Sequence, residues 1–249
     1  MKTVLINCSP KKQFCASAYF LSLQRLFVGG QKVNETLRTP ADHGRILQQL
    51  RDAQAVVFVL PLYVDGVPSH VLRFMQEMET CCKQNGLRLG VYCVANNGFI
   101  EGRQNEPLMQ VFEHFCERAG LRWGGGVGIG GGVMLNVTRI VFLVQIAMLA
   151  LGVVLSVAKT GNPFPKDTWI SFGENAALLL FFNLGVLYYL GRMGRFIRKE
   201  AYSGKKYTRI LIPSFIFILF ADVFFIIISF FQGGLFRGWL ARKPYEGDA

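Results

Sequence analysis

The sequence lacks the cysteine spacing of metal and redox sites, and its first residues do not have the pattern expected of a secretory leader. Its six cysteines occur at positions 8, 15, 81, 82, 93 and 116, and none of them forms a CxxC pair. The adjacent Cys81 and Cys82 are poorly placed for a disulfide with each other. The first residues, Met1–Thr3, run directly into a short apolar strand, without a long apolar region and a small-residue cleavage site. We therefore expect reduced thiols in a cytosolic compartment.

Three classes of site motif are missing as well. The segment Asn7–Ser17 has no spaced glycines followed by Gly-Lys-Ser/Thr, so it is not a Walker A loop. Gly126–Gly131 has the spelling G-x-G-x-x-G, but it comes late, leads into an apolar run and has no acidic residue at the expected distance. The three histidines, His43, His70 and His114, are too scattered for a metal site. We expect no bound metal, and no catalytic triad is recognisable.

Positive charge is abundant but unevenly distributed. The net charge of +11 divides into +4 for residues 1–137 and +7 for residues 138–249, where the cations lie between long apolar runs. The segment Gly191–Arg209 alone carries seven cations against the single acid Glu200. Cations gathered in a short loop between apolar segments are typical of membrane topology. We therefore expect a lipid bilayer as a partner, and no nucleic acid.

Three apolar runs in the second half are long enough to cross a membrane, which takes about 20 residues. They are Ile140–Ala158, Phe172–Leu190 and Ile210–Phe231. Because basic loops stay in the cytoplasm, the basic segment between the second and third runs predicts the orientation. The sequence thus predicts a multi-pass protein of the inner (plasma) membrane, with residues 1–135 as a cytoplasmic domain and residues 136–249 as a membrane domain.

The third run contains one carboxylate, Asp222. A charged group near the middle of a membrane span is costly and is by default a candidate functional residue. Asn183 and Gln145, in the other two runs, are candidate partners for it. A packing hydrogen bond between helices is the alternative interpretation.

The first half alternates between strand-like and helix-like segments. Ala55–Leu60 is apolar without alternation, which is typical of a strand buried on both faces, and Pro61 ends it. Thr3–Ile6 and Leu87–Ala95 are also largely apolar, contain β-branched residues and are typical of strands. About five strand–helix repeats in roughly 135 residues predict an α/β fold with a doubly wound, five-stranded parallel sheet.

Polar loops follow these strands, where open parallel sheets bind their ligands. The first loop combines the hydroxyls of Ser9 and Ser17 with the cation of Lys11, ahead of a predicted helix N-terminus. That combination suits a phosphate group. A surface loop with solvated lysines is the alternative interpretation.

Three motifs carry a resemblance to a known family: Asn7–Lys12, Pro61–Pro68 and Ala95–Phe99. In this order they resemble the flavodoxin-like NAD(P)H-dependent FMN reductase and quinone reductase family, over residues 1 to about 132. The resemblance implies that the first loop holds the FMN phosphate and that the other two hold the isoalloxazine ring. Two positions depart from the family pattern: Cys8 replaces the usual Gly, and Lys11 stands where Arg is common.

The residues also have the chemistry that FMN requires. A dianion needs cations and a helix N-terminus, a flat ring needs an aromatic wall, and the ring edge needs backbone donors. No catalytic side chain is needed, because the flavin carries the chemistry. The candidate cofactor-binding residues are Ser9, Lys11, Ser17, Pro61, Leu62, Tyr63, Gly66, Asn96, Asn97, Gly98 and Phe99.

We therefore expect a membrane-anchored, FMN-dependent oxidoreductase that uses NAD(P)H as co-substrate. Its electron acceptor would be a quinone, a small organic molecule or a protein, and a homodimer is left open. Two alternatives remain: a flavodoxin-like one-electron carrier, and an FMN-free regulatory or binding module on a membrane anchor.

Overall fold

The computed structural model describes residues 1–12, 14–161 and 166–231. The chain divides into two compact units, Met1–Leu211 and Ile212–Ala249. Within its described part, the second unit consists of the helix α7 (Ser214–Phe231). All other helices and strands belong to the first unit.

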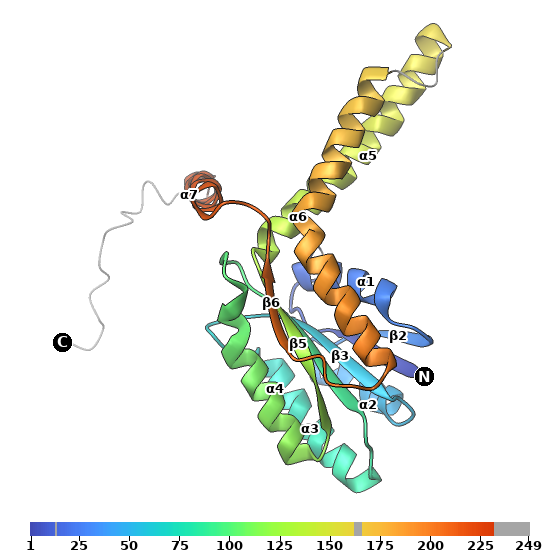
Figure 1. Cartoon of the computed structure of the whole chain (residues 1–249), viewed down its shortest axis with the longest axis vertical. Coiled ribbons are helices and arrows are strands. Elements are labelled where there is room, and N and C mark those ends of the chain that lie inside the picture. Colours follow the sequence, from blue (N-terminus) through green and yellow to red (C-terminus); the bar gives the residue numbers. More distant parts are fainter. Residues whose placement is uncertain (13, 162–165, 232–249) are drawn as a thin grey trace, which may run out of the picture. The chain divides into compact units, whose positions relative to one another are not determined.

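A parallel sheet forms the centre of the first unit (Figure 1). Its strand order is β2-β1-β3-β4-β5-β6, and each neighbouring pair is parallel. The first five strands have the 2-1-3-4-5 order of flavodoxin-like folds. This confirms the doubly wound α/β fold and, at the level of the fold, the predicted resemblance. The strands are β1 (Lys2–Asn7), β2 (Gln31–Thr36), β3 (Ala55–Pro61), β4 (Gly90–Asn96), β5 (Arg122–Gly130) and β6 (Lys205–Arg209).

Helices cover both faces of this sheet. The helices α2 (His43–Leu50), α3 (Ser69–Asn85) and α4 (Glu106–Ala119) cover one face, and α1 (Ala16–Phe27) covers the other. Short 3-10 turns precede α2 and α4: η1 (Pro40–Asp42) and η2 (Gly102–Asn105).

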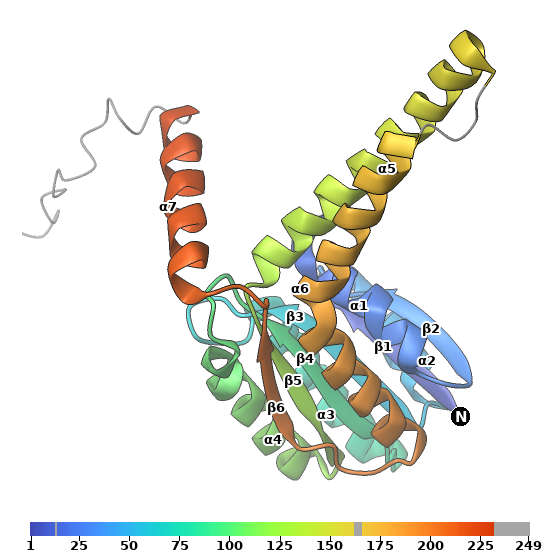
Figure 2. The same cartoon turned by 45° about the horizontal axis from the view of Figure 1, so that its top comes forward.

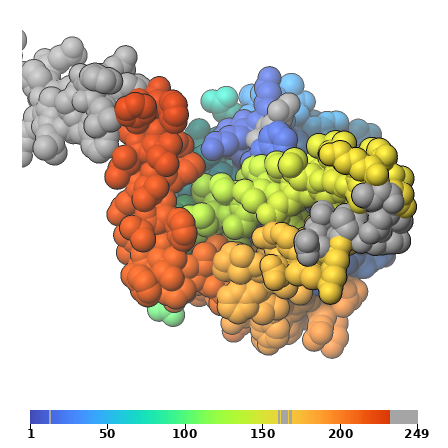
Figure 3. Space-filling view, turned by 90° about the horizontal axis from the view of Figure 1, so that it is seen from above, coloured from blue at the N-terminus to red at the C-terminus, as the bar shows by residue number. Residues whose placement is uncertain are grey.

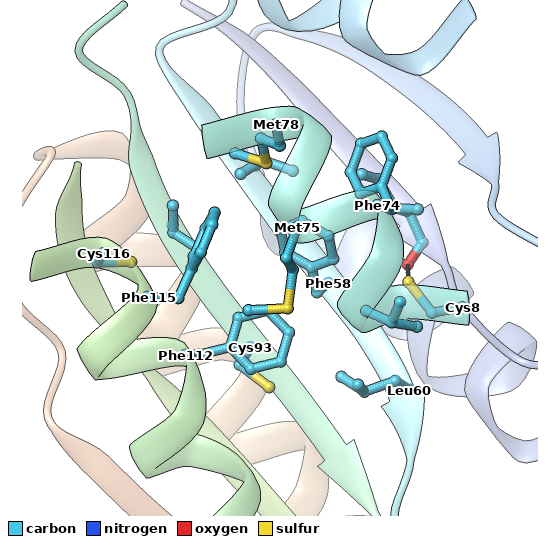
Figure 4. Packing of buried hydrophobic residues seen from close by; sticks show 14 of the residues in the cluster. Cys8, Phe58, Leu60, Phe74, Met75, Met78, Cys93, Phe112, Phe115 and Cys116 are labelled. Atoms are coloured by element: carbon cyan, nitrogen blue, oxygen red, sulfur yellow. Dashed lines mark hydrogen bonds between the residues drawn. The ribbon is translucent and has the colours of Figure 1, made fainter. Parts of the chain in front are cut away.

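The strand β3 is buried on both faces, as its unbroken apolar run predicts. The Phe58 ring of β3 packs against one aromatic ring of α3 and one of α4 (Figure 4). Its ring centroid lies 5.1 Å from that of Phe112 in α4 and 6.2 Å from that of Phe74 in α3. All three side chains are fully buried. This aromatic cluster fixes α3 and α4 on the sheet and thereby positions the loops at the ends of β3 and β4.

The predicted count of five strands is wrong by one, because β6 extends the sheet beyond β5. Its sequence, Lys-Lys-Tyr-Thr-Arg, is short and charged, so no apolar pattern marks it as a strand. Charged residues are nevertheless common on edge strands, since they discourage pairing with other chains. Lys205 fastens the strand to the sheet's helical layer, with its Nζ 3.1 Å from Glu106 and 2.8 Å from Glu113.

Two long helices lie between β5 and β6 in sequence. The helix α5 (Gly132–Thr160) begins two residues after β5 ends and leads away from the sheet (Figure 2). The helix α6 (Lys166–Arg198) returns alongside α5, and the two surfaces lie against each other in Figure 3. The last turns of α6 then pack on the sheet beside α1. There they bury Val186, Leu190, Met193 and Ile197, each at most 1% exposed.

The second half of α6 therefore takes the place of the last crossover helix of a doubly wound sheet. The α5–α6 hairpin is inserted between β5 and that helix. The segment predicted as a membrane domain, residues 136–249, thus contributes a helix and an edge strand to the first unit. Whether residues 1–135 fold without them stays a prediction.

Three helices have the length and composition to cross a membrane. The candidate spans are Gly132–Lys159, Trp169–Arg198 and Ser214–Phe231, with mean hydropathies of 2.7, 1.5 and 2.6. They contain the predicted runs 140–158 and 172–190. The predicted third run begins too early, because α7 starts at Ser214 and Ile210 is fully buried behind β6. The Ile210 amide donates a hydrogen bond to the Gly130 carbonyl, which continues the sheet pairing past Arg209.

A buried hydrogen bond joins α6 to α1. The Tyr19 hydroxyl donates to Asn183 Oδ1 at 2.9 Å, and Asn183 Nδ2 donates to the Leu179 carbonyl. Asn183, a candidate partner of Asp222 in the sequence, is thus engaged within the first unit.

Replacing Tyr19 by Phe tests this contact. The substitution leaves the buried Asn183 oxygen without its donor, which typically costs about 1–3 kcal/mol. For a unit of this size we expect the unfolding midpoint in detergent to fall by about 2–10 °C. The control Tyr202→Phe removes a hydroxyl from a residue that is 54% exposed and should leave the midpoint nearly unchanged. Equal shifts in both variants would contradict the account.

Candidate functional site

A cavity of about 130 Å³ lies where the carboxyl ends of β1, β3 and β4 meet the starts of α1 and α5. This is the edge at which open parallel sheets bind ligands. The lining residues are Ser9, Lys11, Phe14, Cys15, Ala16, Ser17, Pro61, Leu62, Tyr63, Asn96, Asn97, Gly98, Val133 and Asn136.

The structure brings nine of the eleven predicted cofactor-binding residues together in this cavity. The two exceptions are Gly66 and Phe99. Gly66 forms the far side of a tight turn with Tyr63, and Phe99 lines a neighbouring hollow. That these eleven residues bind a cofactor stays a prediction.

The loop after β1 is internally braced. The Ser9 side chain is buried, and its Oγ accepts a hydrogen bond from the Lys11 amide at 3.3 Å. Arg38, after β2, donates to the carbonyls of Ser9, Lys11 and Lys12. Arg38 and the Ser9 hydroxyl therefore hold this loop in place beside the start of α1. Sequence reasoning did not identify Arg38, since nothing in the residues near it marks its target.

The helix α1 begins at this loop without a capping side chain among the described residues. Cys15 is its N-cap residue and makes no side-chain cap hydrogen bond. The first amide groups of an α-helix have no partner within the helix, and together with the helix dipole they attract anions. The start of α1 is therefore suited to hold a phosphate group.

Cys8 does not intrude on this loop. Its side chain is fully buried in the core between the sheet and α3, on the far side from α1 (Figure 4). Burial raises the pKa of the Cys8 thiol well above its usual range. The cysteine that replaces the usual glycine thus packs in the core and does not line the cavity.

Asn96 and Asn97, at the end of β4, connect the three loops. Asn96 Nδ2 donates to Ser17 Oγ at 3.1 Å and to the Leu60 carbonyl at 2.9 Å. Asn97 Nδ2 donates to the Glu101 carbonyl, whereas its Oδ1 is buried and has no hydrogen-bond partner among the described residues. A buried acceptor without a donor requires an explanation, and the N–H group of a bound ligand would provide one.

The loop after β3 is a tight two-residue turn. The backbone groups of Tyr63 and Gly66 exchange hydrogen bonds, with Val64 and Asp65 at the tip. Both tip residues have positive φ, 47° and 54°, a conformation normally reserved for Gly, Asn or Asp. For the β-branched Val64 this backbone is strained, and such strain clusters at ligand-binding loops. The turn presents the half-exposed Tyr63 ring at the cavity.

A wider hollow of about 710 Å³ lies next to the cavity and shares the loops after β3 and β4 with it. Its lining includes Asp65, Phe99, Glu101 and Arg103. The Arg103 guanidinium lies over the Tyr207 ring of β6, 5.8 Å from the centroid. The added strand thus supports one wall of this hollow.

Sequence reasoning missed Val133 and Asn136, which both lie in the first two turns of α5. Asn136 Nδ2 donates to the Phe14 carbonyl at 2.6 Å, and Phe14 has a positive φ of 48°. These residues follow a glycine run and precede an apolar run, so their position suggested only an approach to the membrane. The long-range contact with the first loop has no local signal.

The cavity residues provide the kinds of chemical group that FMN binding requires. An anion can bind at the first loop and the start of α1, Asn97 Oδ1 can accept a hydrogen bond from a ring N–H, and Tyr63 offers an aromatic surface. The enclosed volume is smaller than the roughly 300 Å³ at which ligand pockets begin. The enclosed part therefore accommodates only a portion of the nucleotide.

Thiol burial gives a prediction about reactivity. Cys81 is the least buried cysteine, whereas burial raises the pKa of Cys82 to about 11 and that of Cys93 well above its usual range. Because the thiolate is the reactive form, we expect one fast-reacting thiol in the folded chain at pH 8 and six after denaturation. Counting thiols with a chromogenic disulfide reagent checks this. The fast phase should disappear in Cys81→Ser, and its persistence there would contradict the burial pattern.

No protein-family model matches the chain, and no curated protein sequence matches it. Solved structures similar to it include the Trp repressor binding protein from Bacillus subtilis, with 16% identity, a TM-score of 0.43 and coverage of 50% of this chain and 84% of that one. An NADPH-quinone reductase from P. pentosaceus gives 15% identity, a TM-score of 0.43 and coverage of 53% and 86%. The NAD(P)H:quinone oxidoreductase from Methanothermobacter marburgensis gives 12% identity, a TM-score of 0.43 and coverage of 56% of this chain and 92% of that one. Over about half of its length the chain is similar in structure to these proteins, and its own strand order assigns the fold.

Proposed function

We propose that the chain is an FMN-dependent oxidoreductase that takes hydride from NAD(P)H and passes electrons to a quinone or another small acceptor. The observation that carries this proposal is the meeting of nine predicted residues in one cavity at the carboxyl edge of the sheet. Three separate loops supply them, so their convergence does not follow from closeness in sequence.

The residues divide into an anion end and a ring end. The start of α1, the Lys11 side chain and the hydroxyls of Ser9 and Ser17 would bind the phosphate dianion. Asn97 Oδ1 would accept from a ring N–H, and Tyr63 would cover part of the ring and exclude water from it. When bound, FMN supplies the hydride and electron chemistry, so the protein's tasks are to bind and orient it.

We further propose that the α5–α6 hairpin enters the inner membrane with the flavodoxin-like unit in the cytoplasm. Because β5 and β6 are neighbours in one sheet, both ends of the hairpin lie on the same side of any membrane it enters. The basic segment Gly191–Arg209 lies on that side, as the positive-inside rule requires of a cytoplasmic face.

The two helices of the hairpin differ in how much of them is free to enter lipid. The most apolar window of α5 is 0% buried. In α6, the residues from Asn183 onward pack on α1 and the sheet. The apolar part of α6 before Asn183, residues 169–182, measures about 20 Å at 1.5 Å per residue, against a hydrocarbon core of about 30 Å. The helix α5 is therefore the principal span of the hairpin.

An anaerobic titration tests the enzymatic function. The detergent-purified chain, loaded with FMN, is mixed with NADH or NADPH, and the flavin absorbance is followed. We expect one of the two nucleotides to bleach it within seconds. Bleaching by dithionite alone would instead indicate a one-electron carrier, and a chain that takes up no flavin would indicate a binding module.

A further inference from the structure

We infer that the carboxyl edge of the sheet is a membrane-contact surface, on which the mouth of the cavity faces phospholipid headgroups. The inference rests on the membrane insertion proposed above for α5. It concerns a different surface from the lipid-buried helices, namely the loops after β1, β3 and β4.

Large apolar side chains are exposed on three of these loops. Phe14 is 64% exposed, Phe99 is 61% exposed and Val64, at the tip of its strained turn, is fully exposed. Val133, at the start of α5, continues this set at 51%. Apolar residues gathered at one edge of a domain mark an interaction surface. The strained backbone holds the Val64 side chain in solvent, where it packs against no other part of the chain.

The helix α5 fixes the distance from this edge to the membrane. It begins at Gly132, and its uncharged run begins at Ile140. Eight residues of α-helix rise about 12 Å. The headgroup layer on each side of a bilayer is roughly 6 Å thick, the difference between the hydrocarbon core and the whole bilayer. Loops that extend about 6 Å from the start of α5 toward the membrane would therefore reach the headgroup layer.

Charge at this edge favours an anionic lipid surface over a neutral one. In the loops after β1 to β4, the first turns of α5 and the end of β6, three acids, Asp42, Asp65 and Glu101, are outnumbered by six cations, one of which pairs with Glu101. Juxtamembrane cations are attracted to anionic headgroups on the cytoplasmic leaflet. The cations are Lys11, Lys12, Arg38, Arg103, Arg139 and Arg209.

Bilayer contact is favoured over a protein partner because α5 leaves from the same edge (Figure 2). A partner protein would have to occupy the narrow space between the loops and the membrane. Membrane contact also explains why Phe14, Val64 and Phe99 lie on the side of the unit that carries the hairpin.

Fluorescence quenching in vesicles tests the inference with the full chain. On a Cys81→Ser background, a single cysteine is introduced at Val64→Cys or Phe99→Cys and labelled with a small fluorophore. The protein is reconstituted into phosphatidylglycerol–phosphatidylcholine vesicles that contain lipids with either a shallow or a deep nitroxide quencher. Gln84→Cys, at the opposite end of α3, is the matched control, and Met148→Cys in α5 reports insertion.

We expect strong quenching by the shallow quencher at positions 64 and 99, strong quenching by the deep quencher at position 148, and at most a tenth as much by either at position 84. Unquenched labels at 64 and 99, with quenching at 148, would overturn the inference, and so would equal quenching at 84. Circular dichroism confirms that each variant is folded. The result does not depend on flavin, so quenching at 64 and 99 in a protein that binds no FMN would uphold the surface while refuting the proposed function.

Discussion

Reversing the charge of Lys11, in Lys11→Glu, should weaken FMN binding by about 10- to 100-fold. Lys11 lines the cavity beside the start of α1, where the phosphate dianion would lie. Loss of a hydrogen bond to a charged group typically costs about 1.5–3 kcal/mol, and each 1.4 kcal/mol is tenfold in affinity. Titrating the flavin-free chain with FMN and following the loss of flavin fluorescence measures the effect.

Lys12→Glu is the matched control. It makes the same charge change one residue away; both lysines are exposed, but Lys12 does not line the cavity. Its effect should be several-fold smaller and should fade at high salt, because Lys12 would act on the phosphate only at a distance, and salt screens such long-range attraction. Equal effects in the two variants would show that the loop acts only through general charge and would refute a specific phosphate site.

Removing α6 should abolish folding of the flavodoxin-like unit. A chain that ends after residue 137 lacks the four side chains that α6 buries on the sheet: Val186, Leu190, Met193 and Ile197. At about 1.5–3 kcal/mol for each, their burial contributes about 6–12 kcal/mol. That matches the whole stability of a typical domain, about 5–15 kcal/mol. We expect the truncated chain to be insoluble or to unfold without cooperativity.

The complementary chain keeps α6 and omits the hairpin. Residues 1–137 are joined to residues 181–211 through a Gly/Ser linker of about ten residues, which spans roughly 17 Å. This chain should be soluble without detergent and should unfold in one cooperative transition, measured by circular dichroism. If residues 1–137 alone unfold with the same midpoint, then α6 and β6 are not parts of the unit.

The fold was predictable where the local sequence pattern of a segment reflects its place in the folded chain. The run Ala55–Leu60 is apolar because both faces of β3 are covered, so burial leaves a direct trace in the sequence. The loops after Asn7, Pro61 and Asn96 bear polar and turn-forming residues, and parallel strands bring such loops to one edge regardless of the details. This is why nine residues that line one cavity could be named before their contacts were known.

The parts that escaped prediction have no local trace. The strand β6 is recognisable only through its pairing with β5, since its charged sequence is typical of a loop. The helix α6 is apolar both where it packs on the sheet and where it is exposed, and composition does not distinguish the two parts. Asn136 acts through a contact with a residue 122 positions away in sequence, and Arg38 through contacts with residues up to 29 positions away.

Flavin content tests the central claim most directly. The detergent-purified, full-length chain is incubated with FMN and freed of excess, and its visible absorption spectrum is recorded. The bound nucleotide is then released by heat and identified by mass spectrometry. The account predicts a yellow protein with one FMN per chain. A colourless protein that takes up no added FMN would contradict it.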